Sequence, residues 1–146
     1  MKINGKWEGV LVAGLLAMMV SPALARENRE STAQFLPQVM HQDGIRYTSG
    51  GYGLEERSAL EATAKKYDLI ISNADKKGEF TAGTELVIAG KGNHKTLTVK
   101  DVGPLFYAKL PEGTYVIKAV NGDKKVERTL SIVGKKQDRM HLIWPS

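Results

Sequence analysis

The chain has 146 residues, of which 42% are hydrophobic and 25% are charged, and its formal net charge is +5. This size and composition suit one globular domain, and a mild charge spread along the chain does not indicate a nucleic-acid-binding protein. The absence of cysteine excludes disulfides, thiol catalysis and cysteine-based zinc or redox sites.

Residues 1–25 have the three-part organisation of a signal peptide. Lys2 and Lys6 give a positive beginning, and residues 10–20 form an uncharged apolar run. Pro22 then ends any helix, because it lacks the N–H donor and clashes with the preceding turn. The apolar run is shorter than the roughly 20 residues that span a bilayer. A cleaved signal peptide is therefore favoured, with an uncleaved N-terminal membrane anchor as the alternative.

The expected cleavage site follows Ala25, since Ala23-Leu24-Ala25 matches the small-x-small pattern of signal peptidase sites. We expect a periplasmic or secreted mature protein that begins near Arg26 and contacts membrane only through the signal peptide before cleavage. Residues 1–25 contribute +1 to the formal charge of +5, which leaves +4 on the mature protein.

Residues 26–44 are polar and irregular, and we expect a flexible leader there, followed by a single domain over residues 45–146. A helix is predicted over residues 54–67. Acidic residues in its first turn and lysines in its last turn both suit the helix dipole. Leu60, Ala64 and Tyr67 share one face of this helix.

The rest of the domain reads as short strands separated by turns, with Asn121-Gly122 as the strongest hairpin signal. Alternating apolar residues predict half-buried strands, and two sheets must then cover each other's apolar faces. The sequence thus predicts a mainly β fold, an antiparallel β-sandwich with one N-terminal α-helix. The expected strands cover residues 45–47, 69–71, 85–89, 96–100, 105–110, 115–119, 126–133 and 140–144.

The segment Leu110-Pro111-x-Gly113-x-Tyr115-x-Ile117-x-Ala119 resembles the signature of the carboxypeptidase regulatory-like domains, which share the transthyretin-like (prealbumin-like) sandwich. The likeness covers roughly residues 84–144. The stretch from Tyr47 to Tyr67 also resembles the front part of small exported bacterial proteins that carry this sandwich. The resemblance implies a transthyretin-like fold and a role as a folding aid, spacer or contact module. It implies no catalytic residue.

Lysine pairs are scattered along the chain, and such pairs usually lie at helix ends and turn tips in water. We interpret them as solvated surface, which does not favour nucleic-acid binding. The pairs are Lys65-Lys66, Lys76-Lys77, Lys124-Lys125 and Lys135-Lys136.

The loop Gly50–Gly53 precedes the predicted helix, where backbone N–H groups can bind an anion. The nucleotide-loop pattern fails, because Glu56 replaces its third glycine and no Lys-Ser/Thr follows. A tight turn that caps the helix is the favoured interpretation, with a ligand loop as the alternative.

No catalytic, cofactor or metal site is predicted. His41, His94 and His141 lack metal-ligand spacing. The adjacent Glu55 and Glu56 diverge by about 100° on a helix, so they do not form a glycosidase pair. Ser131, Asp138 and His141 lie close in sequence, but without a nucleophile-elbow motif.

The aromatic residues offer the best candidates for a contact surface, because their rings combine apolar area with a polar tip. Tyr52, flanked by glycines, is the first candidate, followed by Tyr47 and Tyr107. We therefore expect a non-enzymatic accessory module of the bacterial envelope that contacts a protein or a surface polysaccharide. The alternative is a small ligand-binding or hydrolytic periplasmic protein with a pocket between helix and sheet. A third interpretation is a homo-oligomer that pairs exposed strand edges.

Overall fold

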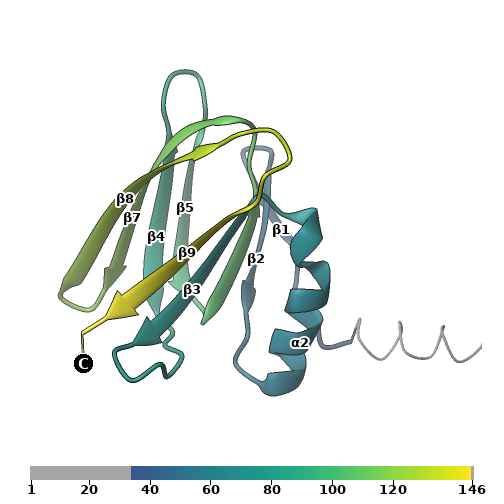
Figure 1. Cartoon of the computed structure of the whole chain (residues 1–146), viewed down its shortest axis with the longest axis vertical. Helices are drawn as coiled ribbons and strands as arrows, with labels where there is room; N and C mark the ends of the chain where they lie inside the picture. Colours follow the sequence, from purple (N-terminus) through teal and green to yellow (C-terminus); the bar gives the residue numbers. More distant parts are fainter. Residues whose placement is uncertain (1–33, 146) are drawn as a thin grey trace, which may run out of the picture.

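A computed structural model describes residues 34–145 of the chain. The expected signal peptide (1–25) and the first part of the expected leader (26–33) lie outside the described residues. The described part is mainly β, with two antiparallel-rich sheets and one short helix, as the sequence predicted (Figure 1).

The first sheet, sheet A, has five strands in the order β1-β2-β6-β3-β9. All neighbouring pairs are antiparallel except β3 and β9, which are parallel. The antiparallel prediction thus holds with this one exception. The bounds are β1 Met40–Gln42, β2 Ile45–Gly50, β3 Leu69–Asp75, β6 Leu105–Lys109 and β9 Asp138–Trp144.

The second sheet, sheet B, has four antiparallel strands in the order β5-β4-β7-β8. Their bounds are β4 Thr84–Gly90, β5 Thr96–Val102, β7 Gly113–Asn121 and β8 Lys124–Ile132. The inward residues of both sheets form the main core, which includes Leu69, Phe106, Ile117, Ile132 and Leu142.

A second layer covers the outer face of sheet A. The helix α2 spans Leu54–Thr63 and continues as the 3-10 turn η1, Ala64–Lys66. It lies on the side of β2 that faces away from sheet B (Figure 1). The apolar cluster beneath it joins Leu60, Ala64, Tyr67, Ile70, Leu105 and Tyr107. The predicted helix face is thus confirmed, and β3 and β6 are apolar on both faces because both faces are covered.

The helix is shorter than predicted, because regular helix ends at Thr63 and the chain is extended by Tyr67. The backbone N–H of Asp68 already donates to the carbonyl of Ala108 on β6, so sheet pairing sets where the helix must stop. The amide of Gln137 donates to the carbonyls of Ala64 and Tyr67, at 2.6 and 3.0 Å. This side chain therefore satisfies two carbonyls at the end of the helical segment.

Two further boundaries differ from the sequence prediction. The expected leader 26–44 includes β1, whose pairing with β2 is closed by a turn with positive φ at Asp43 and Gly44. The hairpin turn lies at Gly122 and Asp123, because Asn121 is still paired with Lys124. Asn121 instead donates from its side chain to Thr84 Oγ1 at 3.0 Å.

Candidate functional site

The three aromatic candidates have different environments. Tyr52 is 60% exposed, in agreement with its expected place in an open loop. Tyr47 is buried in the main core, where its ring stacks on Phe106 at a centroid distance of 5.8 Å. Tyr107 is buried beneath α2. The expectation that Tyr47 and Tyr107 lie on an exposed surface is therefore wrong, because sheet A is covered on both faces.

The loop Gly50–Gly53 is closed by the first turn of the helix that follows it. Gly51 has a φ of +91°, and its N–H donates to Glu56 Oε1 at 3.0 Å. Its carbonyl accepts from Arg57 Nη1 at 3.1 Å. A Cβ at Gly50 would overlap the Glu56 carboxylate. These contacts favour the turn-and-cap interpretation over a ligand loop.

The histidines lie apart from one another. His41 is exposed on β1, and His94 packs its ring 5.5 Å from that of Tyr115. His141 Nδ1 lies 2.6 Å from Ser72 Oγ, a contact that follows from their pairing as register neighbours on β9 and β3. Within residues 34–145, no group of three or more His, Asp or Glu side chains is placed to hold a metal ion.

Ser131 and His141 do not form a catalytic triad with Asp138, because the two side chains contact different partners on different sheets. Ser131 Oγ lies 3.3 Å from Thr114 Oγ1, its register neighbour on β7, and thus makes a cross-strand contact on sheet B. His141 belongs to β9 of sheet A and contacts Ser72 instead.

A groove of about 290 Å³ lies beside α2 on the outer face of sheet A, and we call it the apolar groove. Its apolar floor consists of Ile70, Leu105 and Tyr107. Two side chains that line it are partly open to solvent, Phe80 at 48% and Ile143 at 53%. The remaining lining residues are Glu61, Ser72, Ala74, Arg139, Met140 and His141.

Phe80 is held in place by local structure. Asp75 Oδ1 accepts from the N–H groups of Lys77 and Glu79, at 2.8 and 3.0 Å, and so fixes the turn that precedes Phe80. The guanidinium carbon of Arg57 lies 4.9 Å from the centroid of the Phe80 ring. The exposed ring is therefore positioned by a turn and a cation–π contact.

Tyr107 brings a phenol to the groove. Burial, and secondarily the charge of Glu61, raises the pKa of Tyr107 above its ordinary value. The phenol therefore keeps its proton at neutral pH and can donate a hydrogen bond to a bound group.

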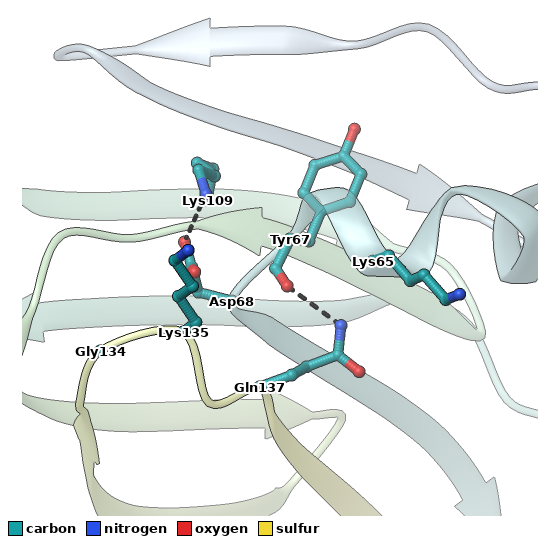
Figure 2. A pocket seen from close by; sticks show the side chains of 7 residues that line it. All are labelled: Lys65, Tyr67, Asp68, Lys109, Gly134, Lys135 and Gln137. Carbon is teal, nitrogen blue, oxygen red and sulfur yellow. Dashed lines mark hydrogen bonds and ion pairs between the residues drawn. The ribbon is translucent and has the colours of Figure 1, made fainter.

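A second hollow, of about 490 Å³, lies where η1, the end of β6 and the β8–β9 loop meet, and we call it the lysine hollow. Three lysines and one acid line it, together with Tyr67, Gly134 and Gln137; the charged residues are Lys65, Asp68, Lys109 and Lys135. Figure 2 shows Lys109 and Lys135 on the Asp68 side of the hollow and Lys65 on the other side of Gln137. Asp68 Oδ2 accepts from the N–H of Leu110 at 3.0 Å and lies 3.5 Å from Lys109 Nζ.

Sequence reasoning raised a pocket between helix and sheet only as an alternative, and it predicted neither the lining of the apolar groove nor the lysine hollow. Ile143 lies on the polar phase of the last strand, and Tyr107 lies opposite the core phase of its strand. Apolar residues at positions that face away from the main core were the signal in the sequence, because they indicate that the outer face of sheet A is covered or occupied.

No protein-family model matches the chain, and a search of curated proteins finds no match. Over residues 34–145, no helix is both long enough and apolar enough to cross a membrane.

Proposed function

We propose that this chain is an exported, non-enzymatic binding module of the bacterial envelope and that it receives an apolar side chain of a partner protein in the apolar groove. One observation carries the proposal: the half-exposed side chains of Phe80 and Ile143 line a groove whose floor consists of buried apolar residues. Solvent-facing apolar side chains beside a hollow with a few polar groups are typical of contact sites in soluble proteins.

The polar groups in the groove suit recognition. Glu61, Arg139, the Tyr107 phenol and the Ser72–His141 pair stand around the apolar floor. Such groups fix the orientation of a bound chain, while burial of its apolar part supplies the free energy. The resemblance to carboxypeptidase regulatory-like domains agrees with a contact module, and a transthyretin-like fold remains our prediction for the family.

The envelope location is supported by the signal-peptide pattern of residues 1–25. We expect the protein recovered from the periplasmic or secreted fraction of bacterial cells to begin at Arg26. Intact-mass measurement of the recovered chain checks this. A mass that includes residues 1–25 would instead indicate an uncleaved anchor.

The partner contact is tested by replacing Phe80 with a photo-crosslinking amino acid in the full chain, expressed in the bacterium that normally produces it. We expect irradiation to join the chain to a discrete partner protein at this position, because the ring stands at the side of the groove. The matched control carries the same crosslinker at Lys100, an exposed position on β5 of sheet B. Equal adducts at both positions, or none at Phe80, would contradict a protein contact in the groove.

A further inference from the structure

We propose that the apolar groove and the lysine hollow form one continuous binding surface and that its occupant is an acidic segment of a partner protein. The segment places a bulky apolar side chain in the groove and a carboxylate at the lysines. This inference rests on the proposed function and names the chemistry of the partner.

Continuity follows from three chain segments, each of which has one residue in the groove and another in the hollow. On β6, Tyr107 lines the groove and Lys109 lines the lysine hollow. These two residues are two positions apart, so their side chains leave the strand on the same face. The groove and the hollow are thus adjacent along this strand.

The same step occurs where the chain enters β9 and where α2 continues into η1. Gln137 lines the hollow and Arg139 lines the groove, again two positions apart. Glu61 lines the groove and Lys65 the hollow, at the i, i+4 spacing that places helix side chains on one face. The edge-on contact of the Tyr67 and Tyr107 rings, 5.5 Å between centroids, joins the two regions.

The charge of the hollow favours a carboxylate. The lining contains three lysines against one aspartate, and Asp68 already accepts from the Leu110 N–H and lies beside Lys109. The nearby Glu112 carboxylate accepts from the Gly134 N–H at 2.6 Å. Within residues 34–145, no carboxylate forms an ion pair with Lys65 or Lys135. The hollow therefore has an excess of positive charge.

The dimensions favour a peptide over a lipid chain. The groove, at about 290 Å³, is at the lower limit of sites that enclose a whole small molecule, and it suits one bulky side chain. Two residues of extended chain cover about 7 Å, so an extended ligand spans the step from groove to hollow in two to three residues. The expected motif is thus an apolar residue with Asp or Glu two or three positions away.

The test uses the mature chain beginning at Arg26 and a random dodecapeptide library displayed on phage. We expect enriched peptides to carry the motif, and we expect the synthetic form of one such peptide to bind in calorimetry more weakly as salt rises. The double variant Lys65→Glu/Lys135→Glu should bind this peptide at least about tenfold more weakly, because it places like charges against the carboxylate.

The matched control is Lys100→Glu/Lys125→Glu, which makes the same charge change on exposed residues of sheet B. It should change the affinity by less than about twofold, since these charges lie outside the surface and are screened by salt. A variant in the groove, Phe80→Ser, should also weaken binding. Circular dichroism establishes that each variant is folded.

The outcomes separate this inference from the proposed function. Enriched peptides that are apolar but not acidic, with unchanged affinity for the lysine variant, would overturn the inference and leave the groove as a protein contact. Unchanged affinity of the Phe80→Ser variant, or the absence of any enriched peptide, would count against both the inference and the proposed function. Lysine-dependent binding to phosphatidylglycerol vesicles in place of peptides would assign the surface to a membrane and overturn the acidic segment.

Discussion

Asn73→Ala is expected to lower the free energy of unfolding by about 3 kcal/mol, because a buried polar cluster depends on this one amide. Asn73 is fully buried on β3. Its Nδ2 donates to the carbonyl of Gly103 at 3.0 Å. Its Oδ1 accepts from Trp144 Nε1 at 3.1 Å and from Thr84 Oγ1 at 3.3 Å. The substitution leaves the Gly103 carbonyl and the Trp144 N–H without this partner, and Thr84 Oγ1 keeps only the bond from Asn121 Nδ2.

Urea unfolding followed by tryptophan fluorescence measures this change, with the midpoint and slope fitted together. Asn93→Ala is the matched control, since Asn93 is exposed in the β4–β5 turn, and it should change stability by less than about 0.5 kcal/mol. Equal effects of the two substitutions would show that the cluster is not a stabilising feature. Asn73 connects β3, β9 and the residues before β6 to the first residue of β4, so its loss should weaken the contact between the sheets.

Phe106→Ala is expected to lower the free energy of unfolding by about 3–5 kcal/mol. The Phe106 side chain is fully buried on β6, the central strand of sheet A, and stacks on Tyr47. The loss combines the transfer free energy of the ring with the cavity that remains, because a strand between two paired neighbours has little freedom to collapse into the space.

The matched control for Phe106→Ala is the same substitution at Phe80, which is half-exposed in the apolar groove. Phe80→Ala should cost about 1 kcal/mol or less, mainly the contact with Arg57, while it removes the apolar contact that we propose for the partner. Urea unfolding and the crosslinking experiment together separate the two roles. A large stability loss at Phe80, or a small one at Phe106, would contradict this assignment of core and surface.

Local patterns in the sequence were sufficient for the strands of sheet B. Leu97 and Val99, and likewise Leu130 and Ile132, alternate with polar residues, and the structure turns them toward the core as predicted. This was possible because one face of each strand meets water, so that the period of two appears in the residue types themselves.

The candidate contact residues show the limit of prediction from local sequence patterns. Tyr52 is exposed because glycines flank it in a loop, a local cause that the sequence displays. Tyr107 is buried because α2 packs over β6. The apolar run Leu105–Ala108 indicates that both faces of this strand are covered, but it does not indicate which element covers the outer face. Phe80 and Ile143, 63 positions apart, meet in the groove only because β3 and β9 pair in parallel.

The sequence by itself determined the β-rich class, the position of the helix and the inward phase of most strands, since each follows from the order of neighbouring residues. The tertiary structure alone decided which sheet face the helix covers, which apolar residues remain in solvent, and how Lys65, Lys109 and Lys135 meet around one hollow. The physical reason is that strand pairing and layer packing join residues distant in the chain, and their free energy depends on contacts that no local pattern encodes.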